Sequence, residues 1–260
     1  EEDLAYIQGA PPVRVAMVNE RYPLSYVRSG ERRGLCMDTF ELISRRTGLR
    51  FEYVYAENYQ SVADLVSSGQ ADVMGAFMDS ENWAQSMGMA LTKRYASLDE
   101  VILKNKKVSY PGDGLVLAVV HGRGLPEGAE AQTVKSYPTF AACVDAVERG
   151  EADVTFIPST FVEDLFYNNY YSQVTIAAAH SAKSQVSIAL PKPVDTRLYA
   201  ILSKAINSIS ASEMEGVLSR NMTSIGQNKF SLKSLIYSNP VAFITVLGGF
   251  LCLVFLLVLL

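Results

Sequence analysis

The sequence contains few cysteines, histidines and basic residues, and these shortages exclude several classes of protein. Its three cysteines are far apart in 260 residues, so they predict neither a disulfide framework nor a zinc site. We expect Cys36, Cys143 and Cys252 to be small core residues. The two histidines have no nucleophile or metal-ligand partner nearby in sequence, which gives no indication of catalysis, cofactor or metal. The formal net charge of −4 leaves no basic surface for nucleic acid.

Hydrophobic residues are abundant enough to build a folded protein. They make up 49% of the chain and charged residues 19%, a composition that can bury the core of one large domain or of two small ones.

The longest uncharged run lies at the end of the sequence. VAFITVLGGFLCLVFLLVLL, residues 241–260, contains no charged residue, and ~20 residues at ~1.5 Å each match the ~30 Å hydrocarbon core of a bilayer. We expect a transmembrane helix here rather than a buried core helix, because core helices are rarely apolar all round. The first residues, EEDLAYIQ, have neither a basic nor an apolar segment typical of a signal peptide, and we expect a further region upstream.

Strand and helix patterns alternate between these ends. VRVAMV at 13–18 is rich in β-branched residues, Met37, Phe40 and Ile43 recur at helical spacing up to Gly48, and FEYVY at 51–55 returns to alternation. This order predicts a βαβ unit.

One ten-residue phrase occurs twice. DLVSSGQADV at 64–73 and DAVERGEADV at 145–154 share D, V, G, A, D and V in register. Each copy predicts a short helix, a glycine in the left-handed conformation and a buried strand beginning at ADV. The repeat predicts two similar α/β lobes, although chance reuse of a common α/β phrase is an alternative.

The segment after the second copy predicts a strand followed by a helix. Asp195 is a candidate N-cap, and one helical face carries a row of apolar residues: Leu198, Ile201, Leu202, Ala205 and Ile209. If this segment packs on the first lobe, the chain crosses between lobes twice, near 104–107 and near 180–185. Two crossings form a hinge.

Five segments in order resemble the family 3 bacterial solute-binding proteins across residues 13–222. They are PLSYVRSGERRGLCMDTFELISRRTGLRFEYV, LVSSGQADVMGAFM, GLVLAVVHGRG, YPTFAACVDAVERGEADV and VSIALPKPVDTRLYAILSKAI. The resemblance implies an α/β, two-lobed flytrap of the periplasmic-binding-protein type II class, which closes on a small polar solute, commonly an amino acid. In such folds each repeated strand ends at the cleft, where open α/β sheets bind ligands.

The resulting domain organisation has four parts. We expect a connector at 1–12, a flytrap at 13–227, a juxtamembrane linker at 228–240 and the membrane helix at 241–260. Lobe 1 is expected to comprise 13–103 and 186–222, and lobe 2 to comprise 108–179.

The membrane helix and the opening segment favour a receptor. EEDLAYIQ looks like the acidic, aromatic connector that precedes flytrap domains in receptor kinases. We therefore expect residues 1–240 to be extracytoplasmic, as the sensing domain of a membrane-bound, dimeric histidine kinase or diguanylate cyclase whose output domain follows Leu260. A solute-binding domain fused to an importer is the alternative. An enzyme on the same scaffold is a third reading, but no paired catalytic carboxylates are visible.

The sequence departs from the amino-acid-binding members of the family at both ionic anchors. The resemblance places the arginine that holds the ligand carboxylate at Ala84, and the aspartate that holds the ammonium at Pro158. Without these groups, we expect free standard amino acids not to bind tightly. The cleft is expected either to take another small polar solute, such as an anion met by Arg21 or Arg123, or to signal without a ligand.

Other residues are candidates to line the cleft. The loop after the first strand, the residues after each ADV strand and the glycine-rich HGRGLPEG supply them, although Phe77 and Met78 are equally consistent with the core and Arg123 with a solvated loop. The candidates are Arg21, Tyr22, Tyr26, Phe77, Met78, Asp79, Trp83, Gly122, Arg123, Pro158 and Ser159.

Overall fold

The computed structural model describes residues 2–19, 21–28, 30–126, 129, 133–222, 245 and 248. Residues 1–222 form one compact unit and residues 223–260 a second. The predicted linker and membrane helix lie outside the described residues, apart from Thr245 and Gly248. None of the helices that the structure describes is long and apolar enough to cross a membrane.

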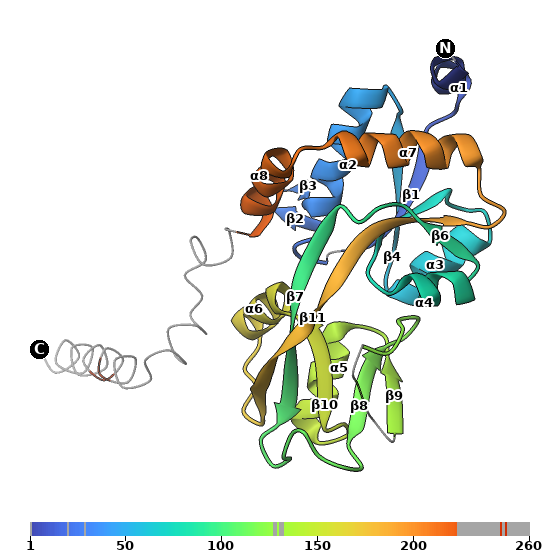
Figure 1. Cartoon of the computed structure of the whole chain (residues 1–260). Helices are drawn as coiled ribbons and strands as arrows, with labels where there is room; N and C mark the ends of the chain where they lie inside the picture. Colours follow the sequence, from blue (N-terminus) through green and yellow to red (C-terminus); the bar gives the residue numbers. More distant parts are fainter. Residues whose placement is uncertain are drawn as a thin grey trace, which may run out of the picture. The chain divides into compact units, whose positions relative to one another are not determined.

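Most strands of the compact unit belong to a single mixed sheet (Figure 1). A separate hairpin is formed by β2 (Tyr26–Arg28) and β3 (Glu31–Arg33). The sheet strands are β1 (Val13–Val18), β4 (Phe51–Ala56), β5 (Val73–Phe77), β6 (Met89–Leu91), β7 (Ala96–Asn105), β8 (Val116–Val120), β9 (Thr133–Tyr137), β10 (Val154–Pro158) and β11 (Val174–Pro191).

The strand order reveals two similar halves. The sheet runs β4-β1-β5-β11-β7-β10-β8-β9, so that β4-β1-β5-β11 read from one end corresponds to β9-β8-β10-β7 read from the other. In each half the first three strands are parallel and the fourth is antiparallel. We call the half built on β1, β4 and β5 lobe 1, and the half built on β8, β9 and β10 lobe 2.

Helices accompany each half of the sheet (Figure 1). Those of lobe 1 are α1 (Glu2–Gly9), α2 (Leu35–Thr47), α3 (Tyr59–Ser67), α4 (Glu81–Ser86), α7 (Thr196–Ser208) and α8 (Ala211–Met222), and those of lobe 2 are α5 (Phe140–Arg149) and α6 (Ser159–Asn168).

The repeated phrase forms the same structure in both lobes. It supplies α3, Gly69 and β5 in lobe 1, and α5, Gly150 and β10 in lobe 2. The two glycines have φ of 74° and 73°, the left-handed conformation that the sequence predicted. The repeat therefore marks equivalent positions in the two lobes.

The aspartate of each ADV sequence tethers its strand to the first strand of its lobe. Asp72 Oδ2 accepts a hydrogen bond from the Arg14 backbone N–H at 2.8 Å, and Asp153 Oδ2 accepts one from the Val116 N–H at 2.7 Å. In return, the N–H groups of Asp72 and Asp153 donate to the carbonyls of Arg14 and Val116. This reciprocal pair explains why the phrase retains an aspartate in both copies.

Two long strands connect the lobes. β7 and β11 pair antiparallel with each other from Ala96 to Asn105, while β7 also pairs with β10 of lobe 2 and β11 with β5 of lobe 1. Figure 1 shows them running side by side through both halves. The predicted lobe limits at 103 and 186 fall inside these strands, and those limits remain predictions.

The local predictions in lobe 1 agree with the structure, with one exception. Gly48 ends α2 with φ of 82°, and the Asp195 side chain caps α7 by accepting from the N–H groups of Arg197 and Leu198. The prediction that Ile209 lies on the α7 face is wrong, because the helix ends at Ser208 and Ile209 has extended backbone. Ile206 occupies that buried face instead.

The described cysteines behave as core residues. Cys36 and Cys143 are both fully buried and unpaired with each other, and burial raises the pKa of each thiol to about 12. Both cysteines belong to the main hydrophobic core. A second, smaller hydrophobic cluster in lobe 2 contains Leu117 and Phe156. Cys252 lies outside the described residues.

Candidate functional site

The amino ends of two equivalent helices border the space between the lobes. Asn58 caps α3 by accepting from Ser61 N–H, and Thr139 caps α5 by accepting from Ala142 N–H. The first helical residue is aromatic in both cases, Tyr59 in lobe 1 and Phe140 in lobe 2. The internal repeat thus places one aromatic residue from each lobe at the site.

A buried ion pair joins the lobes at this place. Nε of Arg123, in the loop after β8, lies 3.1 Å from Oδ1 of Asp79, in the segment after β5. The two side chains are only 11% and 6% exposed. A second guanidinium nitrogen of Arg123 donates to the Met78 carbonyl at 2.9 Å. The side chain of lobe 2 therefore fills a position at the strand ends of lobe 1.

Tyr59 completes the hydrogen bonding of Asp79. Its hydroxyl donates to Asp79 Oδ2 at 2.8 Å and accepts from the Met78 backbone N–H at 3.1 Å. Burial, and then the negative charge of Asp79, raises the pKa of Tyr59 well above its ordinary value, so the phenol remains a donor. Burial alone lowers the pKa of Arg123, but the attraction of Asp79 outweighs it and the pKa is raised.

The glycine-rich loop lets the lobes approach closely. Trp83 Nε1 of α4 donates to the Gly122 carbonyl at 3.0 Å. Gly122 has φ of 85°, and a Cβ there would lie 2.6 Å from Gln60 Oε1 and 3.0 Å from Gln60 Cα. A Cβ on Gly124 would lie 3.0 Å from Cγ of Trp83. A side chain at position 122 would clash with α3 while the lobes are in contact, and one at position 124 would press on the Trp83 ring.

Arg21 is a second arginine beside the ion pair. Its Cζ lies 5.3 Å from the centre of the Phe140 ring, and Arg123 Cζ lies at the same distance. Desolvation, followed by the positive charge of Arg123, lowers the pKa of Arg21 to about 10. Arg21 is half-buried, because one side of the residue borders a cavity.

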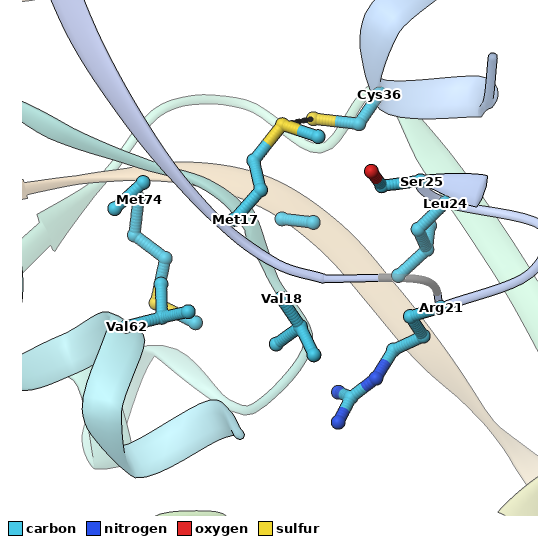
Figure 2. A pocket seen from close by; sticks show the side chains of 10 residues that line it. Met17, Val18, Arg21, Leu24, Ser25, Cys36, Val62 and Met74 are labelled. Carbon is cyan, nitrogen blue, oxygen red and sulfur yellow. Dashed lines mark hydrogen bonds between the residues drawn. The ribbon is translucent and has the colours of Figure 1, made fainter. Parts of the chain in front are cut away.

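That cavity has a volume of about 210 Å³ and lies between the lobes. Val18, Asn19, Arg21 and other residues of lobe 1 line one side, and residues of α5 and α6 line the other. A much smaller cavity, of about 10 Å³, lies on the core side of Arg21. Figure 2 shows the side chains that line this smaller cavity, among them Met17, Cys36 and Ser25. The guanidinium of Arg21 is directed away from the sulfur atoms of Met17 and Cys36. Of these two cavities, the larger has room for a small solute.

The structure brings several predicted site residues together. Arg21 and Tyr22 line the larger cavity, and Asp79, Arg123 and the carbonyl groups of Met78 and Gly122 form the contacts between lobes.

Other predicted residues lie elsewhere. Phe77 is fully buried in the core, and Tyr26 donates to Asn221 of α8 at 3.2 Å. Pro158 ends β10 opposite Glu100, and Ser159 begins α6. None of these four side chains makes a described contact with the Arg123–Asp79 pair. At the aligned position of the missing arginine, Ala84 is buried in α4.

Sequence reasoning missed Tyr59, Thr139 and Phe140. A signal was available, because extending the repeat six residues towards the amino terminus aligns NYQSVADLVSSGQADV with TFAACVDAVERGEADV. That alignment pairs the two cap residues and the two aromatic residues.

Comparison with known proteins identifies the family. The family model for bacterial extracellular solute-binding proteins, family 3, matches residues 13–222. The chain belongs to this family. Its two-lobed α/β fold is that of the periplasmic binding proteins, and the matched region resembles a solute-binding domain.

Proteins similar in sequence to this chain include a bacterial sensor protein. The virulence sensor protein BvgS of Bordetella bronchiseptica is 27% identical over 225 residues, covering 81% of this chain and 18% of that protein. The chain thus spans less than a fifth of that relative. The crystal structure of the BvgS periplasmic VFT2 domain of Bordetella pertussis matches with a TM-score of 0.69 and 24% identity, covering 84% of this chain and 97% of that one. An ancestral arginine-binding protein bound to arginine matches with a TM-score of 0.64 and 16% identity, covering 80% and 97%.

Proposed function

We propose that residues 1–222 are the extracytoplasmic sensing domain of a membrane-anchored signalling receptor, and that the lobes close on each other without a solute. The observation that supports this proposal is the Arg123–Asp79 ion pair. It links lobe 2 to lobe 1 at the carboxyl ends of β8 and β5, where open α/β sheets bind ligands. The alignment with the virulence sensor protein BvgS is consistent with it.

A carrier and a sensor make different demands on this position. A carrier must exchange its solute with solvent, and its closure is driven by contacts that the solute makes with both lobes. Here Arg123 supplies those contacts to Asp79 and to the Met78 carbonyl. A domain that closes through its own side chain is suited to report a change in its open–closed balance, which is the task of a receptor. This favours the receptor over the importer-linked alternative.

We propose a route by which lobe motion reaches the end of the unit. Opening about β7 and β11 moves lobe 2 relative to lobe 1, whose last helix is α8. Asn221 near the end of α8 donates to Asp38 of α2 at 2.9 Å and to the Val217 carbonyl, and Tyr26 donates to Asn221. We propose that this polar cluster carries the change towards residues 223–240 and the predicted membrane helix.

The purified unit tests the proposal. Residues 1–222 contain both hydrophobic cores and all the strands that the structure describes, so this segment is expected to fold alone. After exhaustive dialysis, native mass spectrometry gives its mass and small-angle X-ray scattering its compactness. We expect the mass of the bare chain together with closed lobes. An open form when no solute is bound, closing on addition of one, would support the carrier instead.

A further inference from the structure

The register of the two long strands defines a hinge between the lobes. β7 pairs with β10 of lobe 2 from Lys104 back to Glu100, and β11 pairs with β5 of lobe 1 from Ser187 onward. Between these limits, residues 96–99 and 183–186 pair with each other and with no other strand in the described part of the chain. Two-stranded ribbons twist more than wide sheets, so we expect lobe motion to concentrate in this hinge.

Glu100 is a buried acid at the lobe 2 end of the hinge. Among the acids that the structure describes, it alone is buried as a whole residue, with 6% exposure. The hydroxyl of Ser184, itself 3% exposed, donates to the Glu100 carboxylate. Ser184 pairs with Leu98, so this bond crosses diagonally from β11 to β7. Burying a carboxylate is unfavourable unless hydrogen bonds and positive charge compensate it.

The neighbouring acid has quite different surroundings. The Asp99 side chain is 71% exposed and pairs with Lys183 at 2.8 Å. Successive side chains of a strand point to opposite faces, so Asp99 and Glu100 lie on opposite faces of β7. An exposed ion pair contributes little to stability. Asp99 is therefore a matched reference for Glu100, since it has the same charge on the same strand.

Glu100 acts on the arginine that joins the lobes. It pairs with Pro158 at the end of β10, and β10 adjoins β8, whose following loop carries Arg123. Burial lowers the pKa of Arg123, whereas the charge of Asp79, then Tyr59 and then the charge of Glu100 raise it. Two acids thus favour the charged guanidinium, one from lobe 1 and one from the hinge.

The influence of Glu100 depends on whether the lobes are closed. Arg123 is only 11% exposed in the closed form, and attraction between charges is much stronger in such surroundings than in water. Opening the lobes would expose Arg123 to water and screen its attraction to Glu100. The acid therefore stabilises the closed form more than the open one.

From these observations we propose that Glu100 is a positioning residue for lobe closure. Its carboxylate, held on the hinge by Ser184, stabilises the Arg123 guanidinium in the position where it reaches Asp79. The proposal rests on the proposed function and adds a hinge residue to the pair that closes the lobes.

Double electron–electron resonance on residues 1–222 tests the proposal, with spin labels at Ser68→Cys and Val134→Cys, one in each lobe. Glu100→Gln should raise the ratio of open to closed molecules at least fivefold, because the charge is lost. Ser184→Ala keeps the charge and should change the ratio less than twofold. Asp99→Asn, the matched control, should also change it less than twofold.

A second background separates this role from a structural one. In the Asp79→Leu, Arg123→Met chain, adding Glu100→Gln should change the ratio less than twofold, because the arginine on which Glu100 acts is absent. A structural role through Ser184 alone would give the same effect in both backgrounds. Glu100→Asp keeps the charge and should restore most of the closure lost in Glu100→Gln. Thermal unfolding shows that each variant is folded.

Four results would overturn the proposal. They are a Glu100→Gln chain as closed as the natural one, equal opening by Asp99→Asn, an undiminished effect of Glu100→Gln without Arg123, and no rescue by Glu100→Asp. The proposed function would still stand if exchanging the charges of Asp79 and Arg123 restores closure.

Discussion

The Arg123 guanidinium of lobe 2 lies 3.1 Å from the Asp79 carboxylate of lobe 1, in a position that is almost inaccessible to solvent. A flytrap closed by a solute places ligand groups between its lobes, whereas this chain places one of its own side chains there. The balance between open and closed forms therefore depends on a residue pair that mutation can change.

Removing one partner of this pair should be more harmful than removing both. Asp79→Asn leaves the buried Arg123 without its carboxylate partner, and losing one partner of a buried pair typically costs ~3–5 kcal/mol. The closed form loses that stability, and the lobes should open. The double variant Asp79→Leu, Arg123→Met should recover much of it, because paired apolar substitutions are often neutral. Urea unfolding of the three proteins measures the difference. A double variant that is no more stable than Asp79→Asn would contradict this account.

Gly122→Ala should open the cleft without unfolding either lobe. Its Cβ would meet the backbone Cα of Gln60 at 3.0 Å, so the loop must withdraw from α3. Gly88→Ala is the matched control, since Gly88 also has positive φ but has nothing within 4 Å of its Cβ position. Small-angle scattering should show expansion of the Gly122→Ala protein and none of the Gly88→Ala protein. Equal expansion of both would indicate general backbone strain.

The single tryptophan reports on closure. Trp83 Nε1 donates to Gly122 across the two lobes, and the ring packs near Gly124. Opening exposes the indole to water, so the emission maximum should shift to longer wavelength in Arg123→Ala. The control Arg149→Ala removes an exposed arginine of lobe 2 and should leave the emission unchanged. If Arg123→Ala also leaves it unchanged, the ion pair does not hold the lobes together.

The described cysteines should resist alkylation in the native state. Burial raises the pKa of the Cys36 and Cys143 thiols to about 12, so the reactive thiolate is scarce below that pH, and both are inaccessible. Residues 1–222 should react with iodoacetamide at pH 8 only after denaturation. Mass spectrometry of the treated protein checks this, and rapid native modification at either cysteine would show that its lobe opens locally.

The tethering aspartates of the repeat should contribute to stability in each lobe. Asp153→Ala leaves the Val116 N–H without its carboxylate acceptor and should lower the free energy of unfolding by about 1–3 kcal/mol. Asp72→Ala should cost at least as much, because Asp72 also pairs with the Arg14 guanidinium at 2.7 Å. Thermal unfolding of both variants, with the exposed Asp113→Ala as control, measures the cost. A negligible effect at Asp153 would show that the tether is dispensable.

Much of the fold could be predicted from local sequence patterns. The repeat predicted two helix–glycine–strand units, because helical periodicity and a left-handed glycine can both be recognised within ten consecutive residues. Asp195 likewise predicted the start of α7, since a cap bonds residues two and three positions ahead. The end of α7 was less predictable, because Ile209 keeps the apolar spacing while its backbone has left the helix.

The pairing at the site depends on how the lobes meet. Asp79 and Arg123 were both candidates, but their contact joins residues 44 positions apart in different lobes, and no local pattern encodes it. Phe140 was not among the candidates, although the extended repeat aligns it with Tyr59.

Distance measurements between the lobes test the ion pair most directly. Spin labels at Ser68→Cys and Val134→Cys, both exposed positions, report the separation of lobes 1 and 2 by double electron–electron resonance in dialysed residues 1–222. We predict one short distance for the natural pair, a longer or broader distribution for Arg123→Asp, and return to the short distance when Asp79→Arg is added to Arg123→Asp. Rescue by the exchanged charges supports closure by this pair. A short distance that persists in Arg123→Asp would contradict it.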